Sequence, residues 1–158
     1  MTGLLNQFIN RVLSGSSHKK PRQKEERPIE ERVVLGALLS LVAYADNVFS
    51  SEEEKMIKKI LVSRCGYKEE EVPLILASAR EAIRSCLDIQ GFTREVNQRR
   101  GYQERLRILE NLFRVAFSDQ SLVYQELETI RKIATLFWIS HKDFINTKLK
   151  IKKEMTNR

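Results

Sequence analysis

The sequence predicts an all-α protein, a compact bundle of about seven helices with an internal pseudo-repeat. Apolar residues recur every three or four positions along most of the chain, which is the period of a helix. No run of alternating β-branched residues marks a strand. Two helical hairpins align when the chain is shifted by 73 positions. With 158 residues, 42% of them apolar, the chain can bury a core without a disulfide or a structural metal.

The first 29 residues differ from the rest of the chain. Apolar residues at helical spacing predict a short amphipathic helix over 3–13. A polar stretch with Ser, Gly and Pro follows and is typical of a flexible linker, which we expect to end near Pro28. The chain is therefore divided into an N-terminal helix and linker (1–29), a helical domain (30–153) and a disordered basic tail (154–158).

The first half of the domain contains three helices. One apolar stripe predicts a helix over about 30–45. Ser50 stands three positions before Glu53, the spacing of a capping box, and predicts the start of the next helix. Gly66 is expected to end that helix. Pro73 fits the first turn of a third helix that reaches about residue 87.

The second half repeats this plan after a short helix over about 92–98. A long helix carries Leu106, Leu109 and Leu112 and is followed by a turn at 118–121. Another helix comes next, and Ser140 is expected to cap the last one. Phe137 and Trp138 stand at that junction and are expected to be core or joint residues.

The two hairpins match in more than their apolar period. Each ends a long helix with Asp and places a Glu seven residues later, near the start of the following helix. The matched pairs are Leu35 with Ile108, Leu39 with Leu112, Val42 with Val115, Ala43 with Ala116, Asp46 with Asp119, Phe49 with Leu122, Glu53 with Glu126, Ile57 with Ile130 and Ile60 with Ile133.

Two interpretations of the repeated acids remain open. If the halves pack with pseudo-twofold symmetry, Asp46, Glu53, Asp119 and Glu126 converge, and hard cations such as Ca²⁺ favour carboxylate oxygens in such an arrangement. Alternatively, the glutamates stabilise helix N-termini and the aspartates cap their own turns.

The turns and their flanks also resemble a known family. The matching stretches are 43–46 with 49–53, 115–119 with Glu126, 92–94, 105–115 and 139–144. In their order and spacing they resemble the stand-alone bacterial branch of the tellurite-resistance TerB-like family. The family turn carries a glycine where this chain has Asn47 and Gln120. Asn tolerates a left-handed backbone better than Gln, so we expect the second turn to be reshaped.

The resemblance implies a compact helical fold, an acidic surface that binds metal ions and a role in stress or tellurite response, without enzymatic activity. We therefore expect a cytoplasmic sensor or interaction module that takes Ca²⁺ or another divalent metal through Asp46, Glu53, Asp119 and Glu126, supported by Asn47 and Gln120. We also expect a protein partner, which the sequence does not identify. The sequence also leaves the oligomeric state open.

The net charge of +7 suggests an alternative. A peripheral adaptor would use the N-terminal helix and the basic stretch 148–153 to reach an anionic membrane or an acidic protein. Most basic residues alternate with Glu at helical spacing, and no nucleic-acid-binding motif is present, which argues against a nucleic-acid partner. No nucleophile or phosphate loop accompanies the acids, which argues against an enzyme.

Overall fold

The computed structural model describes residues 26–84 and 89–158, and within them it is all-α. Seven α-helices make up this part of the chain: α2 (Glu26–Ala43), α3 (Ser51–Lys59), α4 (Val72–Arg84), α5 (Ile89–Arg99), α6 (Tyr102–Ala116), α7 (Tyr124–Leu136) and α8 (His141–Thr156). The predicted fold class is confirmed. The helix expected over 3–13 and most of the linker lie outside the described residues. Helix α2 begins at Glu26, two residues before the predicted end of the linker near Pro28.

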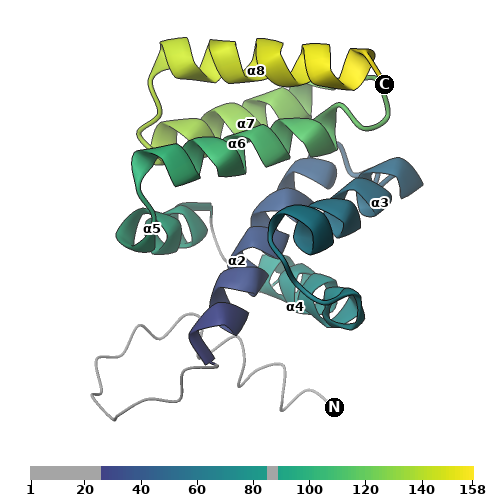
Figure 1. Cartoon of the computed structure of the whole chain (residues 1–158), viewed down its shortest axis with the longest axis vertical. Coiled ribbons are helices and arrows are strands. Elements are labelled where there is room, and N and C mark those ends of the chain that lie inside the picture. Colours follow the sequence, from purple (N-terminus) through teal and green to yellow (C-terminus); the bar gives the residue numbers. More distant parts are fainter. Residues whose placement is uncertain (1–25, 85–88) are drawn as a thin grey trace.

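Helix α2 is the centre of the molecule (Figure 1). It packs against α3, α4, α5, α6 and α7. A single apolar stripe was expected here, but α2 is apolar on several faces, as a helix surrounded by others requires. Its approach to α4 is close: a Cβ on Gly36 would lie 2.8 Å from the Ile75 side chain. The buried residues of α2 are Val33, Val34, Ala37, Leu38, Leu39, Ser40, Val42 and Ala43.

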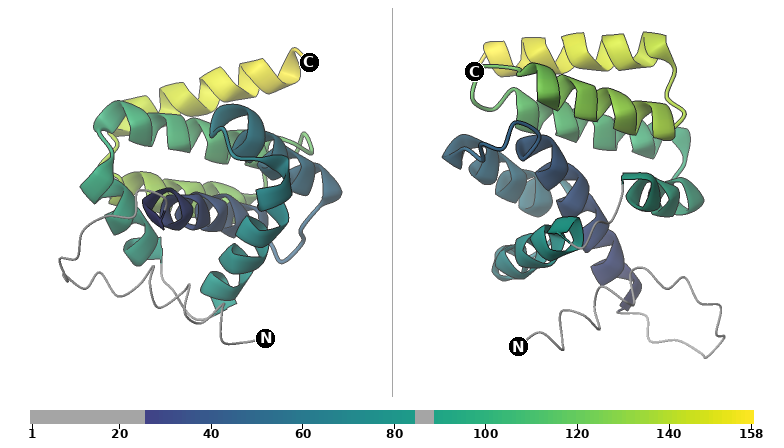
Figure 2. Two further views of the ribbon diagram at one scale, coloured as in Figure 1. Left: turned by 60° about the horizontal axis from the view of Figure 1, so that its bottom comes forward. Right: turned by 180° about the vertical axis from the view of Figure 1, so that it is seen from behind.

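The second half forms a group of three helices above α2. Helix α6 contacts both α7 and α8, and α8 is the outermost layer (Figures 1 and 2). Leu109, Leu112 and Phe113 of α6 are fully buried. Phe137 is buried as expected, whereas Trp138 is exposed and has a left-handed backbone, with φ 55°. Trp138 is therefore a joint residue and not part of the core.

Helix boundaries follow the predicted signals at several points. The Ser50 hydroxyl accepts a hydrogen bond from the Glu53 N–H, and the Ser140 hydroxyl accepts one from the Asp143 N–H. Gly66 has φ 74°, which suits a residue just past a helix end. Before it, the chain passes from α3 into a π-helical segment, Ile60–Arg64, which the apolar period does not distinguish from an α-helix.

The predicted disordered tail at 154–158 is wrong for most of its length. Helix α8 continues to Thr156. Arg114, which is almost fully buried on α6, donates from Nε and one terminal nitrogen to the two carboxylate oxygens of Glu154, each at 3.0 Å. This two-point ion pair holds the last turns of α8 against α6. In the described ranges, no helix combines the length and apolar content that crossing a membrane requires.

Candidate functional site

The two hairpins that the sequence aligns have the same turn geometry. At the end of α2, the Asn47 N–H donates to the Tyr44 carbonyl at 3.0 Å, and at the end of α6 the Gln120 N–H donates to the Phe117 carbonyl at 3.1 Å. Asn47 has φ 62° and Gln120 has φ 65°. The expected reshaping of the second turn is therefore wrong, because Gln120 adopts the left-handed conformation despite its unfavourable side chain.

The two aspartates cap these turns in the same way. Oδ1 of Asp46 accepts the Val48 N–H at 3.0 Å, and Oδ1 of Asp119 accepts the Ser121 N–H at 3.2 Å. Both are Asx turns. Among the described residues, Oδ2 of each aspartate accepts no hydrogen bond. The capping interpretation is thus confirmed for both aspartates, and each keeps one oxygen available.

The two glutamates cap the helices that follow. The Glu53 carboxylate accepts the Ser50 N–H at 2.8 Å, and the Glu126 carboxylate accepts the Val123 N–H at 3.2 Å. Each occupies the third position of its helix, where a carboxylate also interacts favourably with the helix dipole. Capping alone would leave such side chains in solvent. Glu53 and Glu126 are instead each only 1% exposed.

These two buried carboxyl groups meet. The side chain of Glu53 is within hydrogen-bonding reach of Glu126 and raises the pKa of that carboxyl group. Both turns lie at the same end of the molecule (Figures 1 and 2). Two carboxyl groups can hydrogen-bond to each other only when one of them carries a proton. The predicted convergence of the repeats is therefore observed for their glutamates.

The pKa of Glu126 is strongly raised. Burial, the hydrogen bond with Glu53 and the negative charges of Glu53 and Asp119 raise the pKa of Glu126 to about 8. The Val123 N–H opposes this shift but does not cancel it. At neutral pH the two carboxyl groups therefore share one proton, and the pair holds one negative charge in a buried position.

Only part of the predicted four-acid site is assembled. Glu53 and Glu126 are in contact, and Asp119 is close enough to influence the pKa of Glu126, whereas Asp46 is not among the groups that shift it. Across residues 26–84 and 89–158, no three or more His, Cys, Asp or Glu side chains are placed to hold a metal ion. The donors are of the kind that hard cations favour, but they do not form a ready-made cage. The metal site stays a prediction.

The near-complete burial of the glutamates is a feature that the sequence analysis did not identify. Glu53 stands four residues before Ile57 and seven before Ile60, and Glu126 precedes Ile130 and Ile133 by the same intervals. These spacings place both glutamates on the apolar face of their helices. That position was the available signal, since a glutamate that only caps a helix has no need to lie there.

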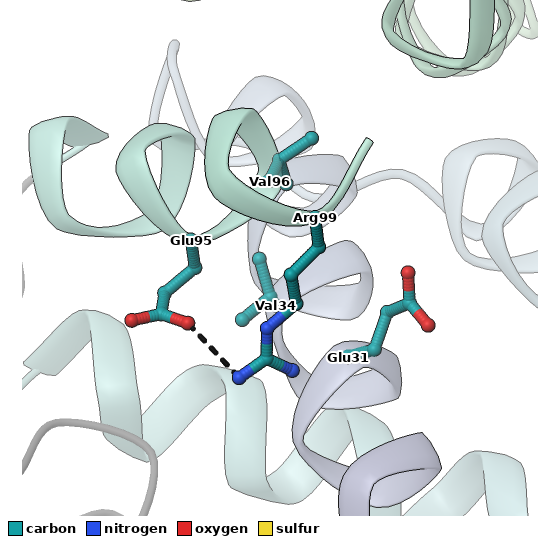
Figure 3. A pocket seen from close by; sticks show the side chains of 5 residues that line it. All are labelled: Glu31, Val34, Glu95, Val96 and Arg99. Carbon is teal, nitrogen blue, oxygen red and sulfur yellow. Dashed lines mark ion pairs between the residues drawn. The ribbon is translucent and has the colours of Figure 1, made fainter. Parts of the chain in front are cut away.

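A surface depression elsewhere contains none of the four acids. It is open to solvent and lies between α2 and α5 (Figure 3). Its lining is Glu31, Val34, Glu95, Val96 and Arg99. Arg99 is paired with Glu95 at 3.2 Å. The depression is separate from the carboxyl pair and supplies no cleft for it.

The fold and the site together define a class of protein: a helical module made of two fused hairpins that meet through a buried acid pair. A family model matches most of the chain. Residues 32–149 match the model for tellurite resistance protein TerB, and the chain therefore belongs to the TerB family. This family is a helical domain that is not known as an enzyme. No match was found among curated proteins or among solved structures.

Proposed function

We propose that this TerB domain is a non-enzymatic module of the cytoplasmic stress or tellurite response that takes up a hard divalent cation at the corner where its two hairpins meet. The contact between Glu53 and Glu126 carries the proposal, because it joins one acid from each repeat in a buried position. Loss of the Glu126 proton gives the pair a second negative charge that nothing in the described residues neutralises. A divalent cation is a suitable counter-charge for it.

The remaining acids complete the proposed ligand set. Asp46 and Asp119 each have an oxygen that accepts no hydrogen bond among the described residues, and their turns lie at the same end of the molecule. Ca²⁺ or another hard divalent cation would supply two positive charges there. Glu53 and Glu126 belong to different hairpins, so an ion held by both would oppose separation of the two halves. The surface that the module presents to a protein partner would then differ between the ion-bound and the ion-free form.

A titration of the full chain tests the proposal. Its melting temperature should rise with the concentration of Ca²⁺, Mg²⁺ or Mn²⁺, because a ligand that binds the native state stabilises it by mass action. Asp46→Asn combined with Asp119→Asn keeps both turn hydrogen bonds and removes two charges, and the rise should then be much smaller. The matched control is Glu52→Gln with Glu54→Gln, which removes two exposed charges of α3. A full rise in the aspartate variant would contradict the proposal.

A further inference from the structure

Helix α8 presents one face to the domain and the opposite face to solvent. Phe144, Thr147 and Ile151 are buried against the rest of the molecule, and α8 is the outermost helix of its group (Figures 1 and 2). On the opposite side, Lys142, Leu149, Lys152 and Lys153 are exposed. On a helical wheel these four positions spread over the broad side of α8 that is turned away from the buried residues. We define these residues, together with the half-exposed Lys148, as the outward face of α8.

This face is cationic because both acids of the helix bind partners on the domain. The Asp143 carboxylate accepts the Tyr102 hydroxyl at 2.5 Å. Glu154 is held by Arg114, with further pairing to Arg64 at 3.6 Å. Lys150 lies beside this face and pairs with Glu110 at 2.6 Å.

The lysines of the outward face have no such partners. Among the described residues Lys142, Lys148, Lys152 and Lys153 form no ion pair. The outward face therefore carries four positive charges, three exposed and one half-exposed, with which no acid of the described residues pairs.

An exposed leucine stands in the middle of these lysines. Leu149 is 57% exposed, although α8 has buried positions for apolar residues at Phe144 and Ile151. A basic helix face with an apolar residue at its centre suits the boundary between anionic headgroups and acyl chains, where the lysines meet the headgroups and the leucine reaches below them. A partner bound by charge alone, such as DNA or an acidic peptide, would contact the lysines and leave Leu149 in solvent.

We propose that the outward face of α8 is a docking surface for anionic lipid membranes. This inference is independent of the proposed cation site, since it uses none of the four acids. The bilayer surface would lie along the helix, with Lys142 towards one end and Lys152 and Lys153 towards the other. The charge of the headgroups is complementary to that of the face, and no other part of the domain has to change shape.

The test is co-sedimentation of the full chain with phosphatidylcholine vesicles that contain or lack phosphatidylglycerol, with EDTA present so that no cation links protein to lipid. We expect sedimentation only with phosphatidylglycerol and a loss of binding as NaCl is raised. Each lysine near an anionic surface changes the affinity about fivefold. Lys148→Gln, Lys152→Gln and Lys153→Gln together should therefore weaken binding by about a hundredfold. Leu149→Ser should weaken it less and leave the salt dependence unchanged.

A matched control separates this face from overall charge. Lys55→Gln, Lys59→Gln and Lys132→Gln remove three exposed lysines elsewhere on the domain and should leave vesicle binding within about twofold of the wild type. Equal losses in the two triple variants would overturn the proposal, as would full binding by the α8 variant or no binding by the wild type. Binding to polyglutamate or duplex DNA without binding to vesicles would show that the partner is an acidic polymer and not a membrane.

Discussion

The two hairpins share their turn geometry but hold their glutamates differently. In the first hairpin, Ser50 caps α3 through its hydroxyl and the Ser50 N–H also donates to Glu53 at 2.8 Å. In the second, Val123 has no side-chain acceptor, and Glu126 receives only the Val123 N–H at 3.2 Å. The raised pKa belongs to Glu126, in the less completely capped hairpin. A duplicated unit can thus keep its turn geometry while its two copies cap the following helix differently.

The copies also differ in how they join the rest of the domain. Arg114 on α6 is nearly buried and paired with Glu154 of α8, whereas the corresponding residue of the first hairpin is Leu41. Leu41 packs against the apolar core as a partly buried residue of α2. Arg114 instead fixes the outer helix α8 through Glu154. Four predictions test these differences between the hairpins.

The largest expected effect is the pH dependence that Glu126 contributes. Its pKa is about 8 in the folded chain against an ordinary value of 4.5, so the folded state binds more protons between these limits. The stabilisation is complete below about pH 4.5 and is lost as the pH rises to about 8. Each pKa unit corresponds to about 1.4 kcal/mol, so the free energy of unfolding should fall by a few kcal/mol.

Urea unfolding at a series of pH values measures this slope. Glu126→Gln retains an acceptor for the Val123 N–H and a donor for Glu53 but cannot titrate, so its stability should vary much less across the same range. Wild-type and Glu126→Gln chains with the same slope would show that Glu126 is not the titrating group.

Arg114→Met should give the next largest effect. Methionine replaces much of the buried stem of Arg114, but Glu154 loses its two-point partner and Glu110 loses an ion pair at 3.5 Å. Because both acids are partly exposed, we expect the free energy of unfolding to fall by about 2 kcal/mol, less than for a fully buried pair. Arg131→Met, which breaks an exposed pair with Glu128, is the control and should cost under about 0.5 kcal/mol. If both substitutions lower the free energy of unfolding equally, the ion pair of Arg114 contributes no more than an exposed pair.

The helix caps should respond in opposite directions in the two hairpins. Ser50→Ala removes the hydroxyl that accepts the Glu53 N–H and should cost about 1 kcal/mol in urea unfolding. Val123→Ser adds such an acceptor to α7 and should gain about 0.5 kcal/mol, since part of the gain is offset by lost apolar burial. If Val123→Ser destabilises the chain, the second hairpin depends on the apolar contacts of Val123 more than on a cap.

The smallest effect concerns the left-handed turn residues. Gln120→Gly should stabilise the chain by about 0.5 kcal/mol, because glycine adopts a positive φ without steric cost while losing more backbone entropy. Asn47→Gly should change the stability by less than half as much, because asparagine already tolerates this conformation. Thermal unfolding of the two variants side by side is the measurement. A larger gain in stability from Asn47→Gly than from Gln120→Gly would contradict this prediction.

Much of the fold could be predicted from the sequence because its signals are local. The apolar period, the Ser50–Glu53 capping box and Gly66 each act within a few residues, and the 73-residue offset aligned turns that have the same hydrogen bonds. The π-helical segment after α3 and the central position of α2 could not be predicted in this way. Both depend on how neighbouring helices pack, which no local pattern describes.

The candidate site could be predicted in its residues but not in its chemistry. The repeat identified Glu53 and Glu126 and suggested that they converge. Whether they are exposed caps or a buried pair depends on how far the second hairpin covers the first. The shared proton follows from that burial, so it required the structure. The contribution of Asp46 to a cation site is a prediction that the cation titration tests.

The most direct test is the titration of the Glu126 carboxyl carbon by NMR in the full chain. If the acid corners of the two hairpins meet in a buried pair, the Glu126 carboxyl group should titrate near pH 8. In Glu53→Gln the midpoint should move down towards the ordinary value, because the negative charge beside Glu126 is gone. A wild-type midpoint near 4.5, unchanged by Glu53→Gln, would show that the two corners do not meet.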